Sequence, residues 1–272
     1  MKSEIPKVLH PMCGRTLLGH AIFAARGLAP DHIAVVVRHE RDRVAAHAAE
    51  CDPGITIADQ DEIKGTGRAL WCGLRALPAD LSGPVVVTAG DTPLLSSDVL
   101  SRLLGRHEGN AVTVLTAVAD DPTGYGRIVR DAEGAVAGVV EHKDATPEQR
   151  EIAEINTSTY VFDADFLREA VGGLDTDNAQ GEMYLTDVVA KAYESGAGTG
   201  SYVVEDSWLV EGCNDLVQLA ALREQLSGRG LEMARVIPIC SFLVNSVSTP
   251  ADSLTPLTDG DAVDVLPPFA GG

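Results

Sequence analysis

The sequence predicts an α/β protein with a largely parallel sheet and helices on both of its faces. Helix-like and strand-like stretches alternate through the first half of the chain at the spacing of strand–helix–strand units. The most informative strand lies in residues 85–95, VVVTAGDTPLL, where three valines run into Ala89-Gly90, Asp91 and Pro93. A short apolar run that ends at Gly and Pro is typical of a buried strand in a parallel sheet.

The other elements follow from periodicity and from residues that end helices and strands. Residues 14–28 repeat apolar side chains at helical spacing before Pro30, whereas residues 32–37 form a continuous apolar run. The expected helices are 14–28, 40–50, 68–77, 97–106, 184–194 and 215–226, and 142–155 is expected to be loop and helix. The expected strands are 32–37, 55–58, 85–88, 111–119, 126–130, 135–141 and 156–162, with one or two short strands in 202–211. The turn residues at 131–134 predict a hairpin between two of these strands.

The composition changes after Gly228, where Pro, Ser and Thr become more frequent. Residues 240–266 have the pattern of two short strands joined by a turn-rich stretch, and the chain ends in PPFAGG. We therefore expect two domains, residues 1–228 and residues 229–272.

The bulk composition excludes several classes of partner. With 272 residues and 45% hydrophobic residues, the chain is long and apolar enough to bury a sizeable core. A formal net charge of −19 argues against binding to nucleic acid or to an anionic membrane. A phosphorylated small molecule remains a possible ligand, because a metal ion and a few local cations can outweigh the global field.

Cysteine usage and hydropathy indicate a cytoplasmic protein. The five cysteines are scattered, odd in number and without a C-x-x-C pair, which predicts a reducing compartment and neither a disulfide scaffold nor a zinc site. The first residues, MKSEIPK, contain no apolar stretch of a signal peptide. The longest apolar run, 236–244, is interrupted by Pro238 and is too short to span a bilayer.

Asp91 is the first candidate for a functional residue. Open α/β sheets bind ligands at the carboxyl ends of their strands, and Asp91 follows such an end. A carboxylate there can hold a hard divalent cation against substrate phosphates. The alternative is that Asp91 caps the helix that starts near Leu95 or sets the turn before Pro93.

Other local groupings also have a functional and a structural interpretation. Lys7 follows a proline, and a lone lysine of this kind is usually a surface charge. In residues 60–68, QDEIKGTGR, two glycines bracket Thr66 at a helix start, where backbone N–H groups can bind an anion or the polar edge of a ring. A plain turn with a threonine cap explains the same pattern.

The second half contributes three further groupings. Residues 124–127, GYGR, allow a ligand to approach the backbone closely, or simply lead into a strand. The segments EHKD (141–144) and EINT (154–157) place glutamates near strand ends, where they can accept protons from sugar hydroxyls or remain solvated charges. In VEGCND (210–215), Asn214 lies at an expected helix N-terminus, and an N-cap role alone would explain it.

Taken in order, these segments resemble one family: the uridylyltransferase domain of bacterial N-acetylglucosamine-1-phosphate uridylyltransferases, usually the first half of a bifunctional enzyme. The resemblance covers about residues 3–222. The matching segments are PKVLH (6–10), Q…GTG (60–67), GDTPLL (90–95), GYGRI (124–128), VEHKDATPEQREI (140–152), EINT (154–157), NAQGEMYLTDV (178–188) and VEGCND (210–215). It implies a Rossmann-like nucleotidyltransferase sheet.

The resemblance also implies an activity and a role for each matched residue. The reaction would join UTP and N-acetylglucosamine 1-phosphate into UDP-N-acetylglucosamine, a cell-wall peptidoglycan precursor, and release pyrophosphate. Asp91 and Asn214 would hold Mg²⁺, and Lys7 would neutralise phosphate charge. Gln60, Gly65 and Thr66 would bind the uracil. The N-acetylated sugar would be bound by Gly126, Glu141, Asn156 and Thr157.

The chain departs from this family in several places. Members of the family begin with a strand and a glycine-rich loop ahead of PKVLH, and neither is present here, so we expect an unpaired position within the sheet and poor turnover. Milder departures are Ala89, where a polar or aromatic residue is frequent, and Ser158, where glycine is usual.

From about residue 221 the chain instead resembles the C-terminal part of a sulfur carrier, the small subunit of molybdopterin synthase, which has a ubiquitin-like fold. The match rests on LTDGD-x-V-x-x-LPP-x-x-GG at the end of the sequence. In that family the terminal glycine, here Gly272 after Gly271, is adenylated by a partner enzyme and becomes a thiocarboxylate. Three hypotheses for the whole chain follow: a nucleotidyltransferase, a sulfur-carrier module, and a non-catalytic binder of nucleotide sugars.

Overall fold

A computed structural model describes residues 5–214, 216–228, 241–244, 247–249 and 263–266. The chain divides into two compact units, Met1–Leu219 and Ala220–Gly272. The first unit is a mixed α/β structure, which confirms the expected fold class. Among the described residues, no helix has the length and apolar character needed to cross a membrane.

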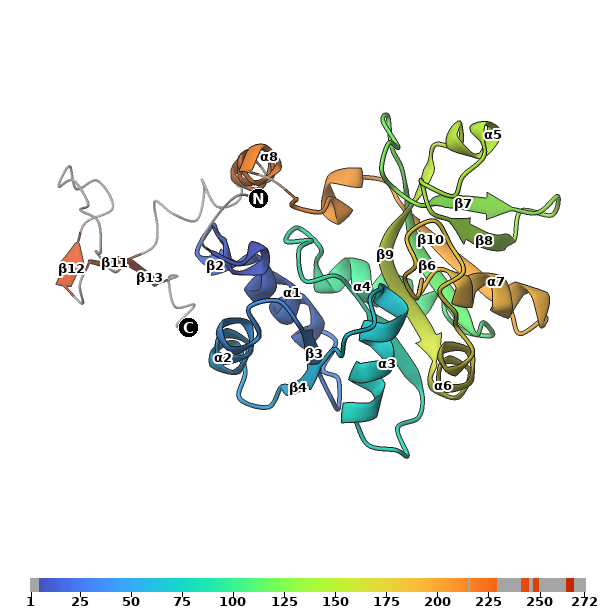
Figure 1. Ribbon diagram of the computed structural model, residues 1–272. Coiled ribbons are helices and arrows are strands. Elements are labelled where there is room, and N and C mark those ends of the chain that lie inside the picture. The colour runs from blue at the N-terminus through green and yellow to red at the C-terminus, as the bar shows by residue number, and fades with distance from the viewer. Residues whose placement is uncertain (1–4, 215, 229–240, 245–246, 250–262, 267–272) are drawn as a thin grey trace. The chain divides into compact units, whose positions relative to one another are not determined.

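Helices and strands alternate through residues 17–118 of the first unit, whereas three strands follow one another directly in residues 112–140 (Figure 1). Its helices are η1 (Lys7–Leu9), α1 (Leu17–Arg26), α2 (Arg41–Cys51), α3 (Thr66–Ala76), α4 (Ser97–Gly105), α5 (Pro147–Arg150), α6 (Ala164–Gly172), α7 (Asp187–Glu194), η2 (Ser207–Val210) and the start of α8 (Leu216–Gly228). Its strands are β1 (Pro11–Met12), β2 (Arg15–Thr16), β3 (Ala34–Val37), β4 (Thr56–Asp59), β5 (Pro84–Val87), β6 (Val112–Val118), β7 (Arg127–Arg130), β8 (Val136–Val140), β9 (Glu154–Asp163) and β10 (Thr199–Val204).

The long strand β9 is the centre of the main sheet (Figure 1). The sheet has the order β10-β6-β9-β7-β8, and β5 also pairs with β9. The pairs β10–β6 and β3–β4 are parallel, whereas β9 runs antiparallel to β5, β6 and β7. The expectation of a largely parallel sheet therefore holds for only part of the molecule.

Strand β5 differs from its sequence prediction. The valines at 85–87 predicted a buried strand in a parallel sheet, but β5 pairs antiparallel to β9 and its residues are only half-buried. Strands β3 and β4 form a separate two-stranded sheet. Within the described residues of the first unit, the strands thus form one six-stranded sheet and two separate two-stranded sheets, β1–β2 and β3–β4.

Strand β9 contains an irregularity where it passes from β7 to β5. Its register with β6 shifts between Val114 and Thr116, as expected for a β-bulge. At the same place Ser158 has φ = +58°, a left-handed conformation that side chains other than glycine seldom adopt. The left-handed backbone at this position favours glycine over serine.

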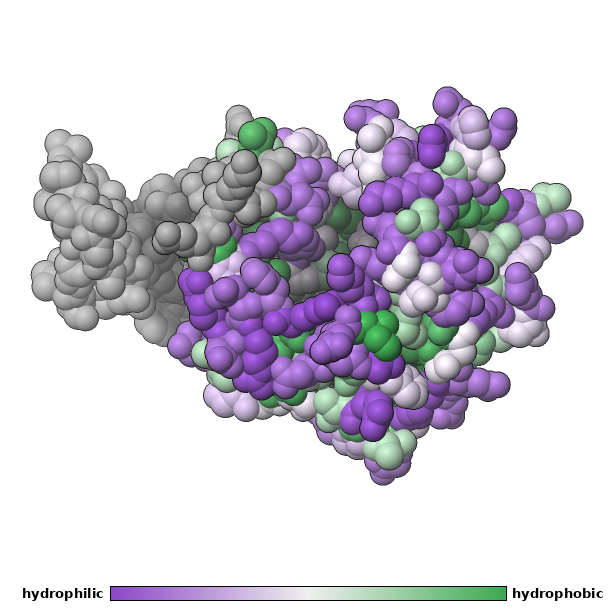
Figure 2. Space-filling view, in the orientation of Figure 1, coloured by the Kyte–Doolittle hydropathy of each residue, from purple (hydrophilic) through white to green (hydrophobic). Residues whose placement is uncertain are grey.

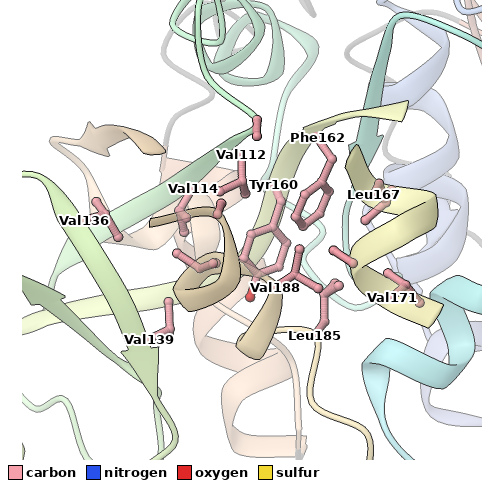
Figure 3. Close-up of a cluster of buried hydrophobic side chains, with 14 of the residues drawn as sticks. Val112, Val114, Val136, Val139, Tyr160, Phe162, Leu167, Val171, Leu185 and Val188 are labelled. Atoms are coloured by element: carbon pink, nitrogen blue, oxygen red, sulfur yellow. The ribbon is translucent and has the colours of Figure 1, made fainter. Parts of the chain in front are cut away.

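Two apolar cores cover the two faces of β9. On one face Tyr160 and Phe162 stack at 5.3 Å and pack with Leu167 of α6 and Val188 of α7 (Figure 3). On the other face Val161 packs with residues of α4 and β10. Alternating side chains of one strand therefore bury helices on opposite sides, and the prediction of helices on both faces is confirmed.

Side chains at the helix starts fix several element boundaries. Thr16, Ser96 and Asp163 each accept a hydrogen bond from a backbone N–H in the first turn of α1, α4 and α6. Thr146 and Gln149 form a capping box at α5, with Pro147 as its first residue. Asp163 followed by a helix-forming run is the signal for α6, which is not among the helices expected from the sequence.

Two other stretches differ from their predicted elements. Residues 202–211 were expected to hold one or two strands, but they contain the end of β10 and the 3₁₀ turn η2, whose start is capped by Asp206. In the second unit, three strands replace the expected two: β11 (Ser241–Val244), β12 (Val247–Thr249) and β13 (Val263–Leu266) form an antiparallel sheet of order β12-β11-β13. The domain boundary near residue 228 stays a prediction.

The surface of the described residues is predominantly hydrophilic on the face shown in Figure 2, with small scattered hydrophobic areas. This agrees with the strongly acidic composition of the chain.

The bulge in β9 generates a stability prediction. Replacing Ser158 by glycine removes the left-handed strain, about 1–2 kcal/mol, but adds about 0.5–1 kcal/mol of unfolded-chain entropy. We expect Ser158→Gly to raise the free energy of unfolding by roughly 0.5–1 kcal/mol in urea titrations. The control Ser158→Ala keeps a Cβ and should not stabilise, because it retains the strain. Equal stability of the glycine and alanine variants would show that the backbone at 158 is unstrained.

Candidate functional site

Three segments that are far apart in the sequence meet around the ammonium group of Lys7. Its Nζ donates to Asp91 Oδ2 and, at 2.9 Å, to Asn214 Oδ1. The Lys7 and Asp91 side chains also form an ion pair, with 37% and 18% of their surfaces exposed. A carboxylate and an amide oxygen therefore converge on one cation, so Lys7 is not an isolated surface charge.

Backbone contacts hold these segments together. The N–H of Cys213 donates to the carbonyl of Asp91 at 2.9 Å, and the Cys213 side chain is fully buried. A Cβ on Gly90 would lie 3.4 Å from the Leu18 side chain, so the turn before Asp91 packs against α1. Ser96, rather than Asp91, caps α4, which removes the helix-cap interpretation of Asp91.

The oxygen donors at this centre fit a hard divalent cation. Mg²⁺ takes oxygen ligands, and it usually binds one or two carboxylates, several waters and substrate phosphates. Asp91 and Asn214 already share a cation, the Lys7 ammonium, whose position stands in for a metal ion between them. In the part of the chain that the structure describes, no group of three or more His, Cys, Asp and Glu residues could hold a metal. These residues therefore fit a metal ion that has few protein ligands and completes its coordination with water and substrate phosphates.

Tyr125 and Glu211 extend this centre and were not singled out in the sequence. Burial raises the pKa of the Tyr125 hydroxyl, and its hydrogen-bonded neighbour Glu211 and the nearby Asp91 carboxylate raise it further. Tyr125 lies in the GYGR segment and Glu211 in VEGCND, so the sequence motifs contained both residues without indicating their proximity.

The segment 60–67 forms a tight loop ahead of α3. Gln60 Nε2 donates to the carbonyls of Ile63 and Gly65, at 2.9 and 3.2 Å, and closes the loop. Gly65 is the N-cap of α3 with φ = +112°, and a Cβ there would lie 2.2 Å from the carbonyl oxygen of Met183. Only glycine fits this contact. Thr66 is therefore not the helix cap that the structural interpretation proposed.

This loop is bound along its length to residues 183–185. Met183 N–H donates to the Lys64 carbonyl, and Gly67 N–H donates to the Met183 carbonyl, both at 2.9 Å. The Thr66 hydroxyl oxygen accepts from the backbone N–H of Leu185 at 3.2 Å. Gln60, Gly65 and Thr66 thus lie together, but their polar groups also hold the loop in place.

Gly126, Glu141 and Asn156 form a second group. The backbone N–H of Asn156 donates to the Gly126 carbonyl at 2.9 Å. A Cβ on Gly126 would lie 3.4 Å from Asn156 Cβ and 3.6 Å from Glu141 Oε2, so the three residues surround one small space. The structure therefore brings these predicted sugar-binding residues together.

Asn156 and Thr157 are buried and have structural partners. Asn156 Nδ2 donates to the Tyr160 hydroxyl at 2.8 Å, and its Oδ1 accepts from Ser158 N–H at 3.1 Å. The Thr157 hydroxyl donates to the Leu115 carbonyl at 2.8 Å. In the same motif, Glu154 accepts from Arg130 and Thr116, so its carboxylate belongs to a structural ion pair.

Glu141 is held in a partly buried acidic environment. Its Oε1 accepts from the Thr186 hydroxyl at 3.3 Å. Burial raises the pKa of the Glu141 carboxyl, the Thr186 hydrogen bond opposes the shift, and the Asp144 and Asp187 carboxylates raise it further. Burial likewise raises the pKa of Asp187. A carboxyl of this kind accepts a hydrogen bond from a ligand at low cost, because it gains a partner for a desolvated charge.

Residues 178–187 tie the two groups together. Asp144 accepts from Ala179 N–H at 2.9 Å and from the Tyr184 hydroxyl at 3.3 Å, while Lys143 Nζ donates to Gln180 at 2.6 Å. The same segment contacts the 60–67 loop through Met183 and reaches Glu141 through Thr186. The sequence pattern of this segment indicated no role for its residues, because their contacts are made across the fold. Gly271 and Gly272 lie outside the described residues.

Comparison with known proteins finds matches to two separate parts of the chain. The family model described as "MobA-like NTP transferase domain" matches residues 1–153, and the "ThiS family" model matches residues 210–272. The "Bifunctional protein GlmU" of Pseudarthrobacter chlorophenolicus is 56% identical over 236 residues, which cover 85% of this chain and 48% of that protein. The protein of the same name from Mycolicibacterium vanbaalenii is 51% identical over 238 residues, with 85% and 48% covered. The chain spans about half the length of the curated relatives it matches.

A solved structure described as "UDP-glucose pyrophosphorylase complexed with UDP-glucose" has a similar fold, with a TM-score of 0.62, 14% identity and coverage of 83% of this chain and 91% of that one. The two-part resemblance noted in the sequence is thereby confirmed. Because the matched residues 1–153 make up more than half of its length, the chain belongs to the family of MobA-like NTP transferase domains.

Proposed function

We propose that this protein is a sugar-phosphate uridylyltransferase that forms UDP-N-acetylglucosamine and pyrophosphate from UTP and N-acetylglucosamine 1-phosphate. The observation that carries the proposal is the convergence of Asp91 and Asn214 on one cation, Lys7 Nζ. Further support comes from the relatives named GlmU, which are more than 50% identical to this chain.

The chemistry requires only groups of this kind. The nucleophile is a phosphate oxygen of the sugar 1-phosphate, which is already anionic at neutral pH, so the reaction needs no catalytic base. It needs in-line positioning and neutralisation of charge on the triphosphate. A Mg²⁺ ion bound by Asp91 and Asn214 would supply part of that neutralisation, and the Lys7 ammonium would supply the rest.

The remaining residues would orient the two substrates. Loop 60–67 presents backbone and side-chain groups of Gln60, Gly65 and Thr66, which we assign to the uracil ring. Gly126, Glu141, Asn156 and Thr157 are assigned to the N-acetylated sugar. The side chains of Asn156 and Thr157 already have hydrogen-bond partners in the fold, so only their remaining donor and acceptor positions would be available to the sugar. Glu141, in contrast, offers a carboxylate oxygen directly.

The first test concerns the cation centre. Asp91→Asn removes one negative charge and should lower Mg²⁺-dependent UTP affinity at least about tenfold, and pyrophosphate release roughly a hundredfold or more. Titration calorimetry with and without Mg²⁺ measures the first effect, and a coupled pyrophosphate assay measures the second. The matched control is Asp98→Asn, the same change at an exposed carboxylate that is paired with Arg102 on α4. Unaltered Mg²⁺-dependent binding in Asp91→Asn would refute the assignment.

The second test separates binding from stability at Glu141. Because the folded pKa of Glu141 lies above its unfolded value, the ionised carboxyl destabilises the fold at neutral pH, and wild-type stability rises as the pH falls through the folded pKa. Glu141→Gln should therefore stabilise the ligand-free protein near pH 8 more than near pH 5. The same variant should lose roughly 5- to 150-fold in affinity for the sugar 1-phosphate, since its oxygen no longer carries a charge.

Urea unfolding at the two pH values and calorimetry with each substrate give the two measurements. UTP affinity serves as the internal control and should change little. Equal losses for both substrates would contradict the assignment of Glu141 to the sugar, whereas a loss of stability at high pH would contradict the raised pKa of its carboxyl. Asn156→Ala is a poorer test, because it leaves the buried Tyr160 hydroxyl without its partner.

A further inference from the structure

Arg127 is the largest fully buried side chain among the described residues, with 1% of its surface exposed. Its guanidinium reaches two backbone carbonyls and an imidazole nitrogen: Nη1 donates to the Tyr125 carbonyl, and Nη2 lies 3.4 Å from His142 Nδ1 and 3.4 Å from the Arg150 carbonyl. Within the described part of the chain, its Nε has no hydrogen-bond partner. Stability alone does not account for this arginine, because an apolar side chain would fill the space without a desolvated charge.

The backbone of Arg127 lies beside the residues assigned to the sugar. Its two partners in the sheet, on β8 and β9, are the residues that precede Glu141 and Asn156. Because both pairs are antiparallel, the next row of the sheet places Gly126 between Glu141 and Asn156, in agreement with the hydrogen bond from Asn156 N–H to the Gly126 carbonyl. Successive side chains of a strand point to opposite faces, so Arg127 lies behind this row.

The guanidinium joins the three segments that carry the sugar-binding row. Tyr125 directly precedes Gly126, and His142 directly follows Glu141. The third contact is to Arg150 at the end of α5, which packs against β7 and leads into β9 (Figure 1). A planar guanidinium holds several acceptors in a fixed geometry, whereas a lysine ammonium on its flexible stem does not.

We propose that Arg127 is a positioning residue for the sugar 1-phosphate, which fixes Gly126 and Glu141 relative to each other from behind the sheet. The inference rests on the proposed function, because the identity of the ligand comes from it. Arg127 acts through its neighbours and does not touch the sugar. Its contacts to the residue before Gly126 and to the residue after Glu141 are the means by which it acts.

The first measurement compares substrate affinities of Arg127→Lys and the wild-type chain by titration calorimetry. Lysine keeps the charge but loses the fork, so we expect affinity for N-acetylglucosamine 1-phosphate to fall about tenfold or more, while affinity for UTP with Mg²⁺ changes little. The matched control is Arg130→Lys on the same strand, since Arg130 bonds to Glu154, Ser201 and the Gly134 carbonyl instead. This control should not discriminate between the two substrates.

A second variant separates positioning from stability. Arg127→Met fills the buried space without a charge, so it should remain folded in urea titrations. It should nevertheless show the same selective loss of affinity for the sugar 1-phosphate, because the acceptors that Arg127 joins are no longer held together.

Hydrogen exchange tests the same role without any substrate. The Asn156 N–H donates to the Gly126 carbonyl at 2.9 Å, so its exchange in the ligand-free protein, followed by NMR, reports how firmly Gly126 is held. Relative to the amide of the fully buried Val161 in the same strand, we expect Arg127→Lys to speed exchange at Asn156 about tenfold or more. Arg130→Lys should leave this ratio nearly unchanged.

The proposal is overturned if the Arg127 variants bind the sugar 1-phosphate as the wild type does, or lose both substrates equally. It is also overturned if Arg130→Lys shows the same selective loss, or if the exchange ratio of Asn156 to Val161 is unchanged in Arg127→Lys. If the wild-type chain binds no N-acetylglucosamine 1-phosphate while Arg127→Lys speeds exchange at Asn156, the proposed function fails and the role of Arg127 in holding Gly126 stands.

Discussion

Strand β9 is the constraint on which the rest of the first unit depends. A central strand must have its backbone hydrogen bonds satisfied on both edges and its side chains covered on both faces. β9 meets the first demand through β6 on one edge and through β5 and β7 on the other, and the second through α6 and α7 on one face and α4 on the other. The bulge at Ser158 lies between the part of β9 that pairs with β7 and the part that pairs with β5, so one strand serves two sets of neighbours.

The candidate site is assembled by contacts between loops rather than by any single motif. Backbone hydrogen bonds join the 60–67 loop to Met183, and the segment that contains Met183 continues to Thr186, which donates to Glu141. A separate backbone bond joins Cys213 to Asp91. Residues 183–186 contact both the 60–67 loop and Glu141. A displacement of this segment would therefore move the residues proposed for the nucleotide as well as those proposed for the sugar.

Partly buried carboxyl groups at the site lower the stability of the ligand-free fold. Glu141 and Asp187 are partly buried carboxyls close to other carboxylates, and burial raises the pKa of both. Such groups are costly in the ligand-free fold, whereas Glu154 in the same region is compensated by Arg130 and Thr116. The difference distinguishes a carboxylate that is available to a ligand from one that the fold itself requires. The Lys7 ammonium compensates the charge of the Asp91 carboxylate and places a cation where the proposed reaction needs one.

The sequence by itself determined the α/β class and most element positions, because apolar periodicity and caps are local properties, and its motifs supplied the residues that we propose for the candidate site. α4 and β6 agree with their predictions within a few residues. Only the tertiary structure decided the antiparallel pairing of β5 with β9, since strand direction depends on partners distant in the sequence. It also decided that Thr66 and Asn156 serve the fold through their side chains, and that Tyr125 and Glu211 lie near Asp91. The contact between Thr66 and Leu185 joins residues 119 positions apart, and Tyr125 and Glu211 also come from distant segments. No local pattern specifies which distant group a side chain will meet.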